Sequence, residues 1–161
     1  MENTDIANWL TGQRITRILV RGYCDASNQN KTLQFHPLWD NVYFETISNI
    51  YCATHLPIGA VSLAPVSDID FAFEKADDDD FYAWTDIIRI LSAIADEPTT
   101  VQNVIIYRSA IHIGLVVAVE LELEHGSIFI DALGIDGLHL GGRGLRELWR
   151  SYHAGRFLPV G

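Results

Sequence analysis

Four carboxylates on two adjoining segments form the pattern in this chain that is most able to do chemistry. Residues 119–124 alternate strictly between apolar and acidic side chains, and residues 127–133 are apolar enough to return as a partner strand. A turn at His125-Gly126 would place Glu120 directly opposite Asp131. Like charges in that register are unfavourable unless water, a proton, a cation or a partner offsets them. The acidic side chains on this face are Glu120, Glu122, Glu124 and Asp131.

Three interpretations of this acidic face compete. It is a solvated sheet surface, a docking surface for a basic partner, or a site for a hard metal ion built from Glu120, Glu122 and Asp131. Calcium and magnesium take oxygen ligands of this kind, but they are usually wrapped by a loop, which an open strand pair lacks. We therefore expect no metal and no other cofactor.

A second acidic cluster runs from Asp68 to the four consecutive residues Asp77, Asp78, Asp79 and Asp80. It precedes a helical apolar stripe, so its last members suit an N-cap and the positive end of a helix dipole. Each such carboxylate contributes only about 0.3–1 kcal/mol, and the effect falls off within one turn. Four in a row exceed what capping needs, and the surplus favours a partner that carries Lys or Arg.

The glycine-rich turn before the last helical segment is a third candidate. Backbone N–H groups at Gly142 and Gly144, with the side chain of Arg143, could hold an anion. The spacing of Gly141, Gly144 and Arg146 resembles the acetyl-coenzyme A loop of GNAT acetyltransferases, although its first and last positions depart from that pattern. The resemblance implies an acyl-coenzyme A or other anionic ligand at this turn.

Other candidate residues carry weaker signals. The chain contains no GxSxG, HExxH or P-loop motif, so an enzyme is the less favoured class. Cys24 and Cys52 lack disulfide or zinc spacing and are expected to be free thiols. His112 is the histidine to suspect if a pocket lies beside it. Trp39 is expected to be partly exposed and to serve as an interface anchor.

The elements that position these residues predict one α+β domain over residues 1–161 with an antiparallel meander sheet. The first 70 residues are mainly β. Apolar side chains at helical spacing predict a core-packed helix over about residues 79–96, and a shorter helix over about 144–153.

Charge gives the broadest statement about function. The segment from Asp40 to Asp136 contains seventeen acidic residues and only three basic ones. The net charge of the whole chain is −10, because the two ends are more basic than this segment. An acidic protein of this kind disfavours nucleic acid as a partner. The chain shows neither a secretory signal nor an apolar run long enough to span a membrane, so we expect a cytoplasmic protein with no membrane partner.

These properties favour a small acidic module that binds a basic protein, of the immunity or antitoxin type that neutralises a nuclease toxin. The partner-binding residues would be Asp77 to Asp80, Glu120, Glu122, Glu124, Asp131 and Trp39. Two alternatives stay open: a small-ligand binder or enzyme that uses residues 141–144, and a structural subunit of an assembly. A homodimer is also compatible with the sequence.

Overall fold

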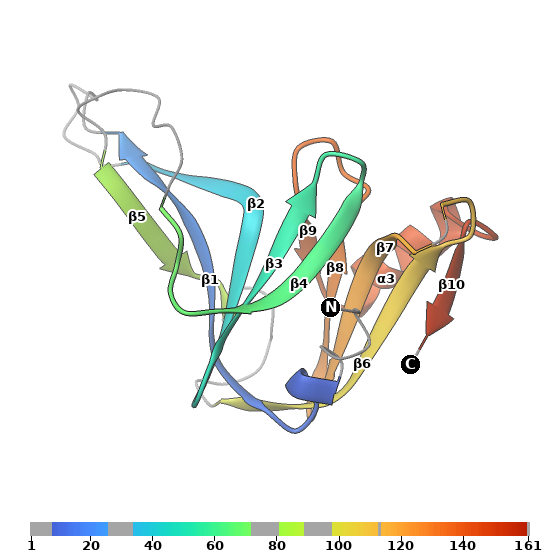
Figure 1. Cartoon of the computed structure of the whole chain (residues 1–161), viewed down its shortest axis with the longest axis horizontal. Coiled ribbons are helices and arrows are strands. Elements are labelled where there is room, and N and C mark those ends of the chain that lie inside the picture. Colours follow the sequence, from blue (N-terminus) through green and yellow to red (C-terminus); the bar gives the residue numbers. More distant parts are fainter. Residues whose placement is uncertain (1–7, 26–33, 72–80, 89–97, 113, 161) are drawn as a thin grey trace.

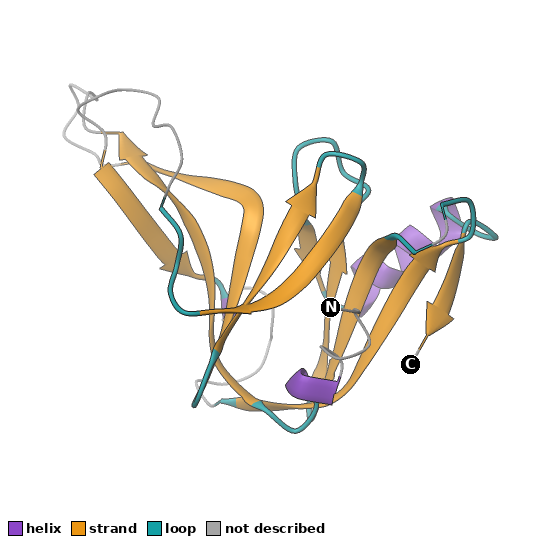
Figure 2. Cartoon of the chain, viewed as in Figure 1, coloured by secondary structure: helices purple, strands orange, loops and turns teal. Residues whose placement is uncertain are grey.

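The computed structural model describes residues 8–25, 34–71, 81–88, 98–112 and 114–160, which are mostly antiparallel β-sheet (Figures 1 and 2). They hold ten strands, a helical turn at residues 8–10 and one longer helix near the C-terminus. The predicted α+β class with a meander sheet is confirmed. The elements are β1 (Arg14–Asp25), β2 (Gln34–Thr46), β3 (Ile50–Leu56), β4 (Ala60–Val66), β5 (Phe81–Asp86), β6 (Thr99–Ser109), β7 (Val116–Leu123), β8 (Gly126–Asp131), β9 (His139–Gly141), α3 (Arg143–Tyr152) and β10 (Phe157–Val160).

The sheet has two wings, joined where β1 meets β6. Its strand order is β4-β3-β2-β1-β6-β7-β8-β9, and β1 and β6 pair only at Arg14 with Thr100 and at Ile15 with Thr99. Beyond that point they diverge (Figure 1), and β5 takes the freed edge of β1 while β10 takes that of β6. We call β1–β5 the first wing, and β6–β10 with α3 the second wing.

The main core fills the space between the two wings. Alternate residues of the facing strands point into it, so that β2, β3 and β4 pack across from β6, β7 and β8. The wings also meet at their far ends, where the backbone N–H of Leu138 donates to the Trp39 carbonyl at 2.7 Å. The largest wholly buried members of this core are Phe44, Leu10, Ile15, Ile18, Leu121, Ile128, Ile130 and Leu138.

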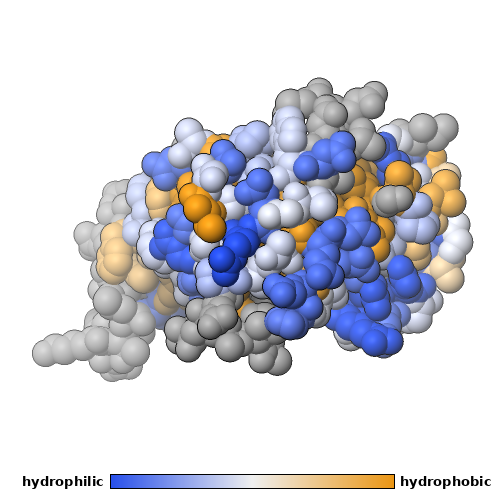
Figure 3. All heavy atoms as spheres, turned by 90° about the horizontal axis from the view of Figure 1, so that it is seen from below, coloured by the Kyte–Doolittle hydropathy of each residue, from blue (hydrophilic) through white to orange (hydrophobic). Residues whose placement is uncertain are grey.

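Each wing also carries a small apolar cluster on its outer face. In the second wing, α3 lies against the outer face of β7 and β8 (Figure 2) and packs Trp149 against Tyr107 and Phe129. In the first wing, Leu19, Tyr43 and Cys52 form a cluster that Ile69 covers. On the face seen in Figure 3, hydrophobic residues appear in small groups among hydrophilic ones.

The helix predicted over about residues 79–96 is wrong for residues 81–86, and within the described part of that range only Ile88 is helical. Residues 81–86 form the strand β5, which pairs with β1 from Leu19–Asp86 to Cys24–Phe81, and the rest of the predicted helix except residues 87 and 88 lies outside the described residues. Phe, Tyr, Trp and Thr suit a strand as well as the apolar stripe of a helix. The unpaired edge of β1, where it leaves β6, needs backbone partners, and β5 supplies them.

The hairpin of β7 and β8 forms, but its register differs from the predicted one. The turn is at Glu124-His125, so Glu120 pairs with Phe129 and Asp131 pairs with Ala118. Gly126 adopts a φ of +108° where the chain enters β8. Because the shift involves two residues, the side chains keep their predicted faces, and Glu120 and Asp131 are diagonal neighbours rather than directly opposite.

Candidate functional site

Glu120 lies at the centre of a buried polar network under α3. Its side chain has no exposed surface, one carboxylate oxygen accepts a hydrogen bond from Tyr107 Oη at 2.8 Å, and the other accepts from Arg146 Nη1 at 2.6 Å. Arg150 Nη2 donates to the same Tyr107 hydroxyl at 2.8 Å. Burial, together with the hydrogen bond to Glu120, raises the pKa of Tyr107. The helix α3 therefore supplies the cation for this carboxylate, Arg146, and a second cation, Arg150, for the tyrosine hydroxyl bound to it.

Asp131 is held by the same helix. Its Oδ1 accepts from the indole N–H of Trp149 at 3.0 Å and from the backbone N–H of Leu133 at 2.8 Å, and its side chain is nearly inaccessible. His139 Nδ1 lies 3.8 Å from Oδ2. The prediction of a solvated acidic face is therefore wrong for Glu120 and Asp131, because the basic C-terminal helix covers them.

Burial leaves Glu120 no accessible surface and Asp131 very little surface for a partner to contact. Glu122 is half-buried and accepts a hydrogen bond from Asn103 Nδ2 at 3.1 Å, and Glu124 is exposed in the turn. The role of Glu122 and Glu124 in partner binding stays a prediction. Among the described residues, no three His, Cys, Asp or Glu side chains are arranged to hold a metal ion.

The glycine-rich turn acts structurally at the start of α3. Gly142 is the N-cap residue, and a Cβ at Gly141 would lie 2.8 Å from Leu145 Cβ, so glycine lets β9 approach the helix closely. Arg143 Nε donates to Glu147 at 2.8 Å, and the Arg146 side chain is engaged with Glu120. Anion binding by Gly142, Arg143 and Gly144 remains an untested prediction, and it would have to compete with these contacts.

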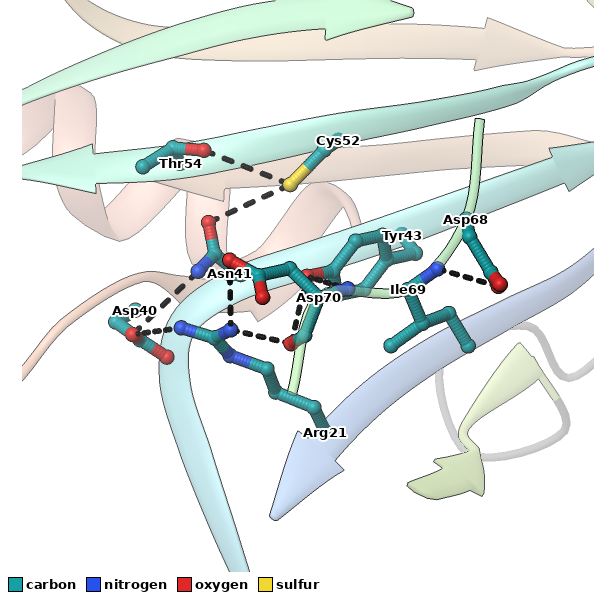
Figure 4. Close-up of polar contacts among 9 residues, drawn as sticks. All are labelled: Arg21, Asp40, Asn41, Tyr43, Cys52, Thr54, Asp68, Ile69 and Asp70. Atoms are coloured by element: carbon teal, nitrogen blue, oxygen red, sulfur yellow. Dashed lines mark hydrogen bonds and ion pairs between the residues drawn. The ribbon is translucent and has the colours of Figure 1, made fainter. Parts of the chain in front are cut away.

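The first wing offers a different arrangement of acids around Arg21 (Figure 4). Arg21 is buried, and its guanidinium donates to Asp40 Oδ2 at 2.6 Å and to the backbone carbonyl of Asp70. Burial works against the charged form, but the hydrogen bond and charge of Asp40 outweigh it, and the pKa of Arg21 is raised overall. The backbone N–H of Asp70 donates to Tyr43 Oη at 3.1 Å. Arg21 and Tyr43 thus fix residue 70 across the sheet.

Ile69 anchors the same segment by packing on the outer cluster of Leu19, Tyr43 and Cys52. Its neighbour Asp68 is exposed, and the side chain of Asp70 is 64% exposed while its Oδ2 lies 3.7 Å from Arg21 Nη1. Cys24 and Cys52 are both free thiols, as predicted, and burial raises the pKa of Cys52. The packing of Ile69 on the outer cluster therefore holds the segment that carries Asp68 and Asp70 in a defined position. The raised pKa of Cys52 means that its thiol is not a reactive thiolate at neutral pH.

Exposed aromatic side chains of β5 lie next to the segment that carries Asp68 and Asp70. Tyr82 and Trp84 are 45% and 46% exposed, Trp84 pairs with Arg21 across the strands, and the ring of Phe71 lies 5.9 Å from that of Tyr82. Arg17 lies 5.2 Å from the centre of the Trp84 ring, a cation–π distance. We call Asp68, Asp70, Tyr82, Trp84 and Asp86 the β5 surface; Asp86, the last residue of β5, is also exposed.

The structure places the predicted residues unevenly with respect to this surface. Asp77, Asp78, Asp79 and Asp80 lie outside the described residues, although they directly precede Phe81 in the sequence. Trp39 is partly exposed, as predicted, and packs against the main core, while its role as an interface anchor stays a prediction. Trp84, which the helical pattern assigned to the core, is the more exposed tryptophan. The alternation Tyr-Ala-Trp-Thr-Asp was the available signal, because in a strand it places Tyr82, Trp84 and Asp86 on one face.

Comparison with protein-family models, with curated proteins and with solved structures finds no match to this chain. None of the helices in the described residues has the length and hydropathy needed to cross a membrane. The β5 surface and the buried network under α3 are therefore interpreted from their own geometry.

Proposed function

We propose that the protein is an acidic, cytoplasmic protein-binding module of the immunity or antitoxin type, which neutralises a basic partner such as a nuclease toxin. The observation that carries the proposal is the β5 surface, where Tyr82 and Trp84 stand exposed among Asp68, Asp70 and Asp86. Tyr and Trp are the residues most enriched at the centres of protein interfaces, and carboxylates beside them select a partner rich in Arg and Lys.

Two further properties support this function. Arg21, Tyr43 and Ile69 hold the acidic segment in place, so its carboxylates lose little conformational entropy when a partner binds. The net charge of −10 attracts a basic protein over a distance and speeds its association. The acidic run at residues 77–80 adds charge next to β5 in the sequence.

The test measures association with purified candidate partners, beginning with any basic protein that is encoded next to this one. We expect the association rate to fall steeply when ionic strength rises from about 0.01 M to about 1 M, because the screening length shortens from about 30 Å to about 3 Å. Trp84→Ala should weaken binding by about 2 kcal/mol or more, as expected of an interface anchor. Tyr152→Ala is the matched control, since Tyr152 is 73% exposed on α3, away from β5.

Charge reversal separates specific contact from the overall charge. Asp68→Lys with Asp70→Lys should lower affinity more than the same reversal at Asp136 and Glu124, which are exposed elsewhere. Equal losses in both double variants, or unchanged binding in the first, would remove the β5 surface from the proposal. Circular dichroism of each variant checks that the fold is retained.

A further inference from the structure

A pocket between the second wing and the turn from β3 to β4 is lined by basic rather than acidic side chains, although the chain as a whole is acidic. It has a volume of about 280 Å³ and lies between the end of α3, the connection from β6 to β7 and the turn from β3 to β4. Leu115, Val117, Trp149 and Phe157 provide apolar wall, and Ile58 and Leu133 lie at exposed positions along it. This size and composition suit a small apolar group.

The ionisable side chains that line the pocket are all basic or neutral. They are His112, His153 and Arg156, and none of the described lining residues is acidic. Arg156 is exposed and forms no ion pair or side-chain hydrogen bond with any residue in the described part of the chain. In a protein of net charge −10, a pocket lined in this way offers an anion a local basic group, Arg156, without an acidic lining residue.

Backbone hydrogen bonds and ring packing hold the segments that carry these polar lining groups. Ser109 Oγ accepts the backbone N–H groups of Ile111 and His112 at 3.2 and 3.0 Å, which fixes the connection that carries His112. His153 ends α3 with its ring 5.4 Å from that of Trp149, and the backbone N–H of Arg156 donates to the His153 carbonyl at 3.0 Å. The basic groups thus approach the pocket from two sides.

We propose that this pocket binds a small anion with an apolar body, such as an aryl or alkyl carboxylate. The apolar part would lie against Trp149, Leu115 and Phe157, and the carboxylate would bind Arg156, with His112 and His153 as further donors. This site is separate from the β5 surface and does not depend on it.

The test compares three probes that share one apolar body: 4-phenylbutyrate, 4-phenylbutanol and 4-phenylbutylamine. Isothermal titration with the intact chain should give the tightest binding for the carboxylate, with the alcohol at least about tenfold weaker, as expected for the loss of a charge-assisted contact. The amine should bind weakest. Amide chemical shifts of Leu115 and His153 should move on titration, which locates the bound probe.

Two variants make the assignment specific. Arg156→Gln should reduce phenylbutyrate affinity by about tenfold and leave the alcohol unchanged, whereas Arg14→Gln, an exposed arginine at the start of β1, should change neither. Leu133→Trp, at a partly exposed wall position, should block all three probes. Equal affinity for the three probes, no binding of phenylbutyrate at millimolar concentration, or indifference to Arg156→Gln would overturn the proposal.

Discussion

Arg146 Nη1 lies 2.6 Å from a carboxylate oxygen of Glu120, whose side chain has no exposed surface. The residues come from opposite charge regions of the chain, the acidic middle and the basic C-terminal segment. Part of the uneven charge distribution is therefore satisfied within the fold. The carboxylates that remain exposed, on the β5 surface and elsewhere, are the ones available to a partner.

Removing one member of this pair should be strongly destabilising. Arg146→Met leaves Glu120 buried without its cation, and we expect a loss of about 3–5 kcal/mol in the free energy of unfolding. The double variant Arg146→Met with Glu120→Gln should recover much of that loss, because no buried charge is then left unpaired. Urea denaturation measures both, and additive losses would show that the two groups are not coupled.

The ion pair between Arg17 and Glu45 predicts a pH dependence of stability. The hydrogen bond and charge of Arg17 lower the pKa of Glu45 below its ordinary value of 4.5. A lowered folded-state pKa adds stability above the unfolded pKa, and this stability is lost as the pH falls through the folded value. Both side chains are partly exposed, with 41% and 24% of their surface accessible, so the contribution is about 0.2–1 kcal/mol.

Comparing the wild type with Glu45→Gln across pH isolates this contribution. The wild type should be the more stable protein at neutral pH, and the difference should disappear at acidic pH and shrink at high salt. A difference that persisted when Glu45 was protonated would point to packing rather than charge. Thermal unfolding monitored at several pH values provides the measurement.

The two thiols should differ in reactivity. Cys52 is 6% exposed, and burial raises its pKa, which lowers the fraction of reactive thiolate at neutral pH. Cys24 is half-exposed on β1. Under native conditions a thiol reagent should modify Cys24 first and Cys52 only after the chain opens, and both should react at once in denaturant. Mass spectrometry after brief labelling identifies the modified residue, and rapid native labelling of Cys52 would contradict this.

Gly22 and Gly144 should respond oppositely to the same substitution. At Gly22, where β1 carries a bulge against β2, an added Cβ would lie 2.1 Å from the His36 carbonyl oxygen. Gly22→Ala should therefore cost at least about 1–3 kcal/mol through overpacking. Gly144 has open space at that point on α3, so Gly144→Ala should stabilise by about 0.5–1 kcal/mol. Chemical denaturation of the two variants compares them directly, and equal effects would be inconsistent with the close approach at Gly22.

Periodicity in the sequence was sufficient to predict which side chains face the core in elements that pack against their neighbours in the chain. Strands β7 and β8 form a hairpin, so the alternation of residues 119–124 assigned their faces even though the turn was shifted. The stripe of α3 placed Trp149 correctly in a buried position. Local periodicity does not show which strands pair when they are far apart in the sequence. Residues 81–86 follow a helical pattern, but they form a strand because they pair with β1, which lies about sixty residues earlier.

By itself the sequence determined the acidic character of the chain, its α+β class, the alternation of the hairpin and the C-terminal helix, since these depend on composition and local spacing. Only the tertiary structure decided which carboxylates are exposed. It buried Glu120 and Asp131 under α3 and left Asp68, Asp70 and Asp86 beside Tyr82 and Trp84. The physical reason is that solvation depends on what covers a residue, and here the covering helix lies later in the chain than the strands it packs on.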